Sequence, residues 1–199
     1  VAEGYMDVIA LVRAGFPAAV APLGTAITDE QLQMIWRLSP EPVIALDGDK
    51  AGLRVGYRLI DLALPHLGAD RALRFCLLPG GMDPDDVLRN MGASAMRKLI
   101  DDAQPLVALL WARETEGQVF DSPERRAALD KRLRTALGQI GDQGLRAHYA
   151  DELRGLRNQM FRPAPQPGRR GQVGRMAPQP TAPQPSTRST RPCALVSTF

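Results

Sequence analysis

The sequence is poor in cysteine, which excludes the small folds that disulfides or structural zinc hold together. Its two cysteines, Cys76 and Cys193, are too few for a disulfide framework or a zinc ribbon. Cys76 lies in an apolar run, so we interpret it as a small buried hydrophobic residue of a protein in a reducing compartment.

Long apolar stretches are also lacking. No segment approaches the roughly 18 consecutive apolar residues of a membrane-spanning helix, so we expect no membrane span. The first residue is Val1, and no charged and then apolar signal segment follows it. We therefore expect the 199 residues to begin within a larger protein.

Acidic residues are absent from the end of the chain. Residues 162–199 contain six arginines, eight of the 17 prolines and no Asp or Glu. Such a segment buries too little apolar surface to fold, so we predict a disordered Pro/Arg-rich linker or tail. Residues 1–161 hold the other 19 basic residues and all 22 acidic ones, a net charge of −3. The high pI therefore belongs to the tail and gives no indication that the folded part binds nucleic acid.

Short apolar runs alternate with segments of helical periodicity over the first 78 residues. We predict strands at 1–3, 18–21, 43–46 and 72–78, and helices at 5–14, 28–38 and 50–64. This alternation predicts an α/β fold, a parallel-sheet core with flanking helices, whose ligands bind beyond the carboxyl ends of the strands. The rest of the chain, to residue 161, is predicted to be helical in segments at 84–91, 94–103, 105–115, 123–139 and 143–161.

The strand predicted at 43–46 ends at two carboxylates, Asp47 and Asp49, with Gly48 between them. In an extended chain, residues i and i+2 point to the same side, so both carboxylates can aim at one point. Two close carboxylates repel unless a cation or proton screens them, and Mg²⁺ favours such a pair together with waters and phosphate oxygens. A solvated turn that caps a helix beginning at Lys50 would use the same residues, so the motif alone leaves both interpretations open.

Four motifs follow one another along the first part of the chain. They are Glu-Gly-Tyr-Met-Asp-Val at 3–8, Leu-Gly-Thr-Ala-Ile-Thr at 23–28, Asp-Gly-Asp-Lys-Ala-Gly at 47–52 and Met-Asp-Pro-Asp-Asp at 82–86. A glutamate that ends the first strand and an Asp-x-Asp pair that ends the third resemble the Toprim domain. Primases, topoisomerases, OLD-family nucleases and RecR-type recombination mediators share that domain. The four motifs together resemble the bacterial DnaG-type replicative primases over residues 1–161.

The resemblance implies an organisation and a reaction. It implies a Toprim catalytic domain over 1–90, the helical subdomain of the primase RNA polymerase core over 91–161 and a linker over 162–199. The implied reaction is the template-directed synthesis of short RNA primers from ribonucleoside triphosphates by two-metal nucleotidyl transfer. The implied cofactors are two Mg²⁺ or Mn²⁺ ions, and zinc is expected only in an N-terminal domain that lies outside these residues.

Three acidic residues are the implied catalytic and metal-binding groups: Glu3, Asp47 and Asp49. Asp47 is the better candidate to bridge two ions. Glu3 would coordinate the catalytic metal or accept a proton, and the sequence does not separate these roles.

Other polar residues are weaker candidates. The resemblance places Asp83 and Asp85 near the metals, but Asp83-Pro84-Asp85-Asp86 is also a model helix start with Asp83 as its N-cap. We expect Asp7 and Asp86 to be surface or cap residues. Candidate contacts to the nucleotide are Gly24, Thr25 and Lys50, although a first-turn lysine is more often solvated.

The resemblance further implies a single-stranded DNA template and ribonucleoside triphosphates as partners, in the bacterial cytoplasm with the nucleoid-associated replication machinery. The replicative helicase would bind through a C-terminal domain outside this chain. Family primases carry their zinc-binding and basic subdomains before the Toprim core, so we predict that these 199 residues alone prime poorly or not at all. The alternatives are a Toprim nuclease or topoisomerase and a non-enzymatic DNA-binding module of the recombination-mediator type.

Overall fold

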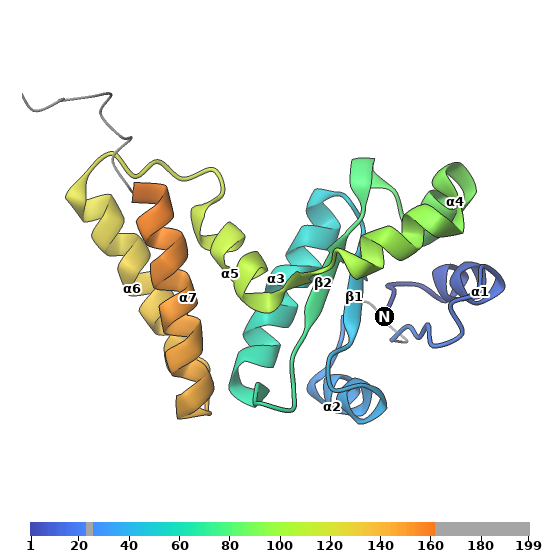
Figure 1. The fold of residues 1–199 in the computed structure, drawn as a ribbon, viewed down its shortest axis with the longest axis horizontal. Helices are drawn as coiled ribbons and strands as arrows, with labels where there is room; N and C mark the ends of the chain where they lie inside the picture. The colour runs from blue at the N-terminus through green and yellow to red at the C-terminus, as the bar shows by residue number, and fades with distance from the viewer. Residues whose placement is uncertain (23–25, 162–199) are drawn as a thin grey trace, which may run out of the picture. The chain divides into compact units, whose positions relative to one another are not determined.

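A three-stranded sheet lies within the fold (Figure 1). In this computed structural model, which describes residues 1–22 and 26–161, its strands are β1 (Val43–Leu46), β2 (Arg74–Leu77) and β3 (Gln104–Pro105) in that order. β1 and β2 are parallel, and the short β3 is antiparallel to β2. The α/β class is confirmed. β3 was not predicted, because a two-residue strand carries no periodic signal.

Two predicted strands, 1–3 and 18–21, are not strands in the structure. The backbone N–H of Ala2 donates a hydrogen bond to the carbonyl of Val20 over 2.9 Å, so the two segments still touch. One such bond is too short a ladder to count as a strand pair. The predictions there were wrong in element type, although the segments do lie side by side.

The start of the chain lies against β1. The amino group of Val1 donates to the carbonyl of Val43 over 2.6 Å, and the carbonyl of Val1 accepts from the N–H of Ala45 over 2.8 Å. Bonds from one residue to the two neighbours of its partner are the pattern of a parallel pair. This register places Glu3 at the same edge of the sheet as the carboxyl end of β1.

Seven α-helices and two short 3₁₀ turns make up most of the described residues. They are α1 (Tyr5–Arg13), α2 (Asp29–Leu38), α3 (Lys50–Ala63), η1 (Leu64–His66), η2 (Pro79–Gly81), α4 (Pro84–Asp101), α5 (Leu106–Thr115), α6 (Pro123–Gln139) and α7 (Gln143–Phe161). Predicted helix starts are confirmed at the N-caps Thr28, Asp83 and Ser122. Gly92, at φ 83°, kinks α4 where two helical segments were predicted. None of these helices is long and apolar enough to cross a membrane.

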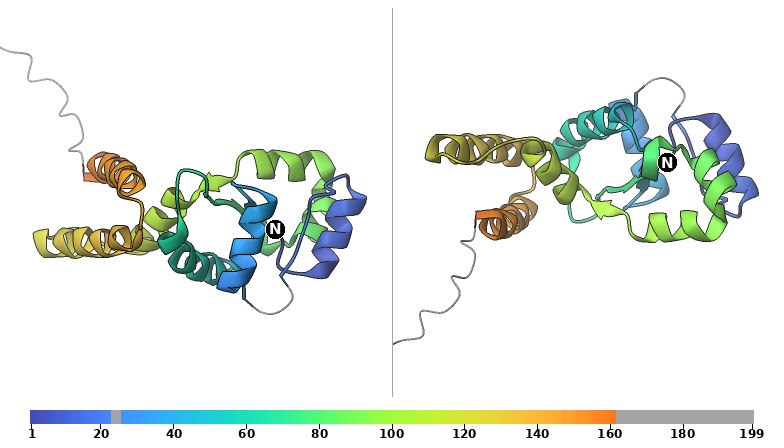
Figure 2. Two further views of the ribbon diagram at one scale, coloured as in Figure 1. Left: turned by 90° about the horizontal axis from the view of Figure 1, so that it is seen from below. Right: turned by 90° about the horizontal axis from the view of Figure 1, so that it is seen from above.

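Helices cover both faces of the sheet. Figure 2 shows α1 and α4 together on one side and α3 on the other. Ile44, Leu46 and Phe75 point into the core under α3, whereas Cys76 points into the core under α1 and α4. The strands are therefore apolar on both sides, as expected for a parallel sheet between helices. Cys76 is buried as predicted, and burial raises the pKa of its thiol to about 11.

The helices after the sheet share its core. Leu109 of α5, Leu129 of α6 and Leu153 of α7 belong to the same buried cluster as Leu46 and Phe75. The described residues accordingly form one compact unit. The predicted boundary after residue 90 falls within α4 and stays a prediction. The predicted linker at 162–199 lies outside the described residues.

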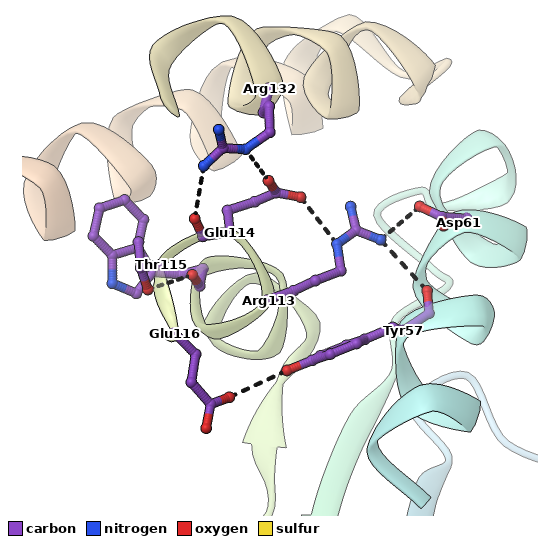
Figure 3. Close-up of polar contacts among 8 residues, drawn as sticks. Tyr57, Asp61, Arg113, Glu114, Thr115, Glu116 and Arg132 are labelled. Atoms are coloured by element: carbon purple, nitrogen blue, oxygen red, sulfur yellow. Dashed lines mark hydrogen bonds and ion pairs between the residues drawn. The ribbon is translucent and has the colours of Figure 1, made fainter. Parts of the chain in front are cut away.

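A network of ion pairs joins α3, α5 and α6 (Figure 3). Glu114 of α5 accepts from the Nε of Arg113 over 3.0 Å and from the Nε of Arg132 of α6 over 2.7 Å. Arg113 also reaches Asp61 of α3 over 2.6 Å. The side chains of Arg113 and Glu114 are only 17% and 12% exposed, so solvent screens this central pair little, whereas Asp61 and Arg132 are 60% and 42% exposed.

Replacing Glu114 by Gln should destabilise the chain by about 1–3 kcal/mol, because two guanidinium groups lose their shared carboxylate in a poorly solvated place. Urea unfolding measures the change. The matched control is Asp121→Asn, which removes an exposed carboxylate from Arg125 and should cost less than about 0.5 kcal/mol. Equal losses in the two variants would contradict the importance of the network.

Candidate active site

The turn after β1 packs against the segment after β2. The N–H of Leu78 donates to the carbonyl of Leu46 over 3.1 Å, and the N–H of Gly48 donates to the carbonyl of Met82 over 3.3 Å. These bonds join the residues that follow the two parallel strands. The Asp47–Asp49 turn and the start of α4 at Asp83 are therefore brought to the same edge of the sheet, where ligands of α/β sheets bind.

Two glycines allow this close packing. A Cβ on Gly48 would lie 2.1 Å from the carbonyl oxygen of Leu78 and 2.8 Å from the nitrogen of Gly81. A Cβ on Gly52 would lie 2.3 Å from the carbonyl oxygen of Asp47. The first glycine lets the turn rest on the neighbouring segment, and the second lets α3 begin directly behind Asp47.

Glu3 and Asp47 have carboxylate oxygens that are buried without a hydrogen-bond partner among the described residues: Oε1 of Glu3 and Oδ1 of Asp47. The Oδ1 of Asp29 is also buried in this sense, but it lies 2.7 Å from the Nε2 of His66. An unpartnered buried carboxylate oxygen is costly and is a position that a bound cation would satisfy. Both residues were predicted as metal ligands from the sequence.

Mutual repulsion links several acidic side chains near this edge of the sheet. Burial raises the pKa of Asp47 to about 6, and the charges of Glu3, Asp7, Asp83 and Asp49 contribute to the rise. Burial likewise raises the pKa of Glu3, with the Asp49 and Asp7 charges adding to it and the backbone N–H of Asp47 opposing it. We call the residues with these couplings the acidic cluster: Glu3, Asp7, Asp47, Asp49, Asp83 and Asp85.

Two members of the acidic cluster are also helix caps. The Oδ1 of Asp49 accepts from the N–H groups of Ala51 and Gly52, both over 2.8 Å, at the start of α3. The Oδ1 of Asp83 accepts from the N–H of Asp86 over 2.7 Å at the start of α4. The capping interpretation of both motifs is therefore confirmed. Because each cap uses only Oδ1, the second oxygen of each carboxylate is left for another ligand.

Asp85 and Asp86, which follow the capping residue Asp83, form ion pairs with an arginine. Arg89 forms ion pairs with Asp85 and, over 3.5 Å, with Asp86. This guanidinium is the one cation paired with the acidic cluster in the described part of the chain. Asp86 lies at the helix surface, as expected.

Asp7 is the member of the cluster that sequence reasoning missed as a site residue. It caps α1, since its Oδ2 accepts from the N–H of Gly4 over 3.1 Å, but it is only 8% exposed and is not a surface residue. Burial raises its pKa, and the charges of Asp83 and Asp85 add to the shift. The available signal was its position one helical turn after Glu3, on a helix that packs against α4.

The structure gives less information on the residues predicted to contact the nucleotide than on the acidic cluster. Lys50 is exposed on the first turn of α3, next to Asp49. Gly24 and Thr25 lie outside the described residues, so their prediction stays a prediction.

The residues present fit a hard divalent cation. Within residues 1–22 and 26–161, no three His, Cys, Asp or Glu side chains are close enough together to hold one metal ion. Mg²⁺ needs only one or two carboxylates when waters and phosphate oxygens complete its shell. The unpartnered oxygens of Glu3 and Asp47 supply such ligands, and an all-oxygen donor set suits Mg²⁺ or Mn²⁺ rather than zinc.

Replacing Asp47 by Asn should raise the melting temperature of the metal-free chain by a few degrees at pH 7.5, because it removes a repelled, poorly solvated charge. The raised pKa means that the folded chain binds the Asp47 proton more tightly than the unfolded chain does. The cost of the charge thus develops as the pH rises from about 4, where the unfolded chain ionises, to about 6, where the folded chain does. The gain should therefore shrink below pH 6 and vanish only near pH 4. Asp70→Asn, at an exposed residue, is the control, and an equal gain there would contradict the assignment.

Comparison with known proteins shows which families and proteins this chain is similar to. The Toprim-like family matches residues 1–88. The DNA primase of Rickettsia felis is 43% identical over 147 residues, which are 74% of this chain and 25% of that protein. The DNA primase of Escherichia coli K12 is 36% identical over 153 residues, which are 77% of this chain and 26% of that protein. The chain spans about a quarter of the length of these relatives.

Solved structures agree with the sequence relatives. The E. coli primase catalytic core superimposes with a TM-score of 0.72 at 35% identity, over 78% of this chain and 50% of that one. A DnaG primase catalytic domain bound to single-stranded DNA gives a TM-score of 0.73 at 35% identity, over 78% of this chain and 49% of that one. The RNA polymerase domain of Mycobacterium tuberculosis primase was solved in complex with double-stranded DNA that has an overhang. It gives a TM-score of 0.59 at 33% identity, over 78% of this chain and 50% of that one.

Proposed function

Because the chain contains a Toprim-like domain and is homologous to part of the DnaG-type DNA primases, we propose that it forms a catalytic segment of a DNA primase. The reaction would be the synthesis of short RNA primers from ribonucleoside triphosphates on single-stranded DNA. One observation carries the proposal. The acidic cluster forms at the carboxyl edge of the sheet, in a chain 36–43% identical to DNA primases.

Glu3, Asp47 and Asp49 would hold the divalent ions, Mg²⁺ or Mn²⁺ and two in number, with Asp83 and Asp85 close by. When bound, such ions activate the attacking 3′-hydroxyl and neutralise the charge of the triphosphate and the leaving pyrophosphate. The unpartnered oxygens of Glu3 and Asp47 support their roles as ligands. The raised pKa of Glu3 also makes it a stronger proton acceptor than an ordinary glutamate.

The chain's own hydrogen bonds would hold this site in shape. Asp49 and Asp83 are fixed by the backbone N–H groups that they cap, so their free oxygens keep a defined direction. The N-terminal end of α3 begins at the site and favours negative charge, as the phosphates of a nucleotide would provide. Lys50 at this helix start, with Gly24 and Thr25 in the preceding loop, is proposed to contact the triphosphate.

The relatives support a primase over the alternative Toprim activities. A nuclease or topoisomerase would cleave supercoiled or linear DNA in the presence of Mg²⁺. A recombination-mediator-type module would bind DNA equally well before and after an Asp47→Asn substitution and would transfer no nucleotide. The matches to primase catalytic cores over 78% of the chain favour the first assignment. The replicative helicase is proposed as a partner of the larger protein rather than of these residues.

A chimera tests the proposal. The matching segment of E. coli DNA primase is replaced by residues 1–161 of this chain, and ribonucleotide incorporation on single-stranded DNA is measured. We expect primer synthesis by the chimera, and little or none by the 199-residue chain alone, which spans a quarter of its relatives' length. A folded chimera without activity, or DNA cleavage by the chain, would contradict the proposal.

A further inference from the structure

We propose that one exposed face of α3 binds the phosphate backbone of single-stranded DNA beside the acidic cluster. The face carries Lys50, Arg54 and Arg58, and we call these three residues the α3 basic stripe. The inference rests on the proposed function and deepens it, because it names the surface of this chain that contacts the DNA strand.

The α3 basic stripe is a line of charges that starts at the site. Its members are four residues apart, so successive side chains lie on neighbouring turns about 6 Å apart along the helix axis. All three residues are exposed. Lys50 directly follows Asp49, so the line leads away from the acidic cluster along the helix. A positively charged track of this kind is how proteins follow the backbone of a single strand.

The charges of the stripe are not used for folding. Most other arginines of the described part are engaged by carboxylates or backbone carbonyls: Arg74, Arg89, Arg113, Arg125, Arg126, Arg132, Arg146, Arg154 and Arg157. No described residue forms an ion pair or hydrogen bond with the side chain of Lys50, Arg54 or Arg58. Residues 23–25 and 162–199 contain no Asp or Glu that could neutralise them.

The one carboxylate on α3 does not neutralise the stripe either. Asp61 lies three residues after Arg58, but it is bound by Arg113 over 2.6 Å. The stripe therefore keeps its positive charge in a part of the chain whose net charge is −3. Clustered unpaired charge of one sign in such a background favours a polyanionic partner.

Two adjoining hollows next to the stripe suit the bases of a strand. One, of about 260 Å³, is lined by Glu3 and Ile27, and the other, of about 240 Å³, is lined by Ile27 and Arg58. They share Ala26, Ile27 and Val55, so together they lead from the acidic cluster to the end of the stripe. The largely aliphatic walls can bury the apolar faces of bases, and the guanidinium of Arg58 at the rim can donate hydrogen bonds to the phosphate that follows.

The test compares two triple variants of the 199-residue chain that lose the same charge. The stripe variant carries Lys50→Gln, Arg54→Gln and Arg58→Gln. The control variant carries Arg13→Gln, Arg37→Gln and Arg134→Gln, at exposed positions on α1, α2 and α6. Both keep the arginines of the tail, so binding through the tail is common to both. Thermal melting checks that both fold like the original chain.

Fluorescence anisotropy with labelled oligothymidylate, recorded over a range of salt, measures binding. Each phosphate contact to a single strand contributes about 0.7 to the slope of log K against log salt concentration. The stripe variant should lose about 2 from this slope and bind about tenfold more weakly at low salt, whereas the control should change by less than about 0.5. Equal losses in the two variants, or unchanged binding by the stripe variant, would overturn the proposal.

Two further measurements distinguish a failure of the DNA-binding proposal for α3 from a failure of the proposed primase function. Oligouridylate of the same length is titrated in parallel, and stripe-dependent binding of the ribo-oligomer alone would overturn the assignment to DNA. Binding needs no catalysis, so an inactive chimera together with stripe-dependent DNA binding would contradict only the proposed reaction. An active chimera whose stripe variant still binds and primes normally would contradict the role of α3 and the proposed contact of Lys50 with the triphosphate, and would leave the proposed reaction standing.

Discussion

Asp47→Asn in the chimeric primase should lower the rate of primer synthesis by at least about 10³-fold, which corresponds to about 4 kcal/mol of transition-state stabilisation. The substitution would keep the shape of the side chain and remove the charge that we propose to hold a divalent cation beside the acidic cluster. Four other carboxylates contribute to the raised pKa of Asp47, whereas two contribute to that of Glu3, so the loss of Asp47 should be the more damaging of these two.

Single-turnover ribonucleotide incorporation at saturating Mg²⁺ measures this effect. The control is Asp70→Asn, an exposed carboxylate before β2, at the opposite edge of the sheet from the acidic cluster. It should leave the rate within about twofold, since a distant exposed charge is screened. An Asp47→Asn chimera that primes at the original rate would remove Asp47 from the metal site.

Gly48→Ala should destabilise the chain by about 3 kcal/mol and abolish activity in the chimera as well. The added Cβ would lie 2.1 Å from the carbonyl oxygen of Leu78 and 2.8 Å from the nitrogen of Gly81. Both neighbours are backbone atoms, which cannot rotate away as a side chain can. The turn at Asp47 and the segment before Asp83 would have to separate, so stability and the arrangement of the cluster should fall together.

Urea unfolding of the 199-residue chain measures the loss. Gly155→Ala is the matched control, because it lies within α7 and a Cβ there meets nothing within 4 Å. It should stabilise the chain by about 0.5–1 kcal/mol, as alanine does in place of glycine inside a helix. A Gly48→Ala variant with the original stability would show that the two segments are not packed as described.

Local signals were sufficient to predict much of the fold. The strand Val43–Leu46 and the helix start at Ser122-Pro123 depend on residues adjacent in sequence, and both are confirmed. Pairing depends on distant partners, and there the sequence was less informative. Residues 18–21 have strand-like composition, but only one backbone hydrogen bond joins them to the start of the chain. The pairing of Gln104 with Phe75 depends on the path of α4, which no local pattern specifies.

In the candidate site, too, features set by local sequence could be predicted and features set by distant packing could not. The position of Glu3 and Asp47 at one edge of the sheet could be predicted, because extended segments that run parallel bring their carboxyl ends to the same edge. The burial of Asp7 could not, since it results from the packing of α1 against α4. Asp49 shows a further limit of sequence reasoning, because helix capping and metal binding both require a carboxylate at this position. The structure shows that Asp49 forms the cap, and metal binding by its second oxygen stays a prediction.

Binding of Mn²⁺ to the 199-residue chain, followed by electron paramagnetic resonance at about pH 7.5, tests the central claim most directly, because it needs no other part of a primase. We predict bound Mn²⁺ that Mg²⁺ displaces, with affinity at least about tenfold lower in Glu3→Gln and in Asp47→Asn than in the original chain. The affinity should also fall below pH 6, where Asp47 takes up a proton. Mn²⁺ binding that is unchanged in both variants would contradict the assignment of these carboxylates as a metal site.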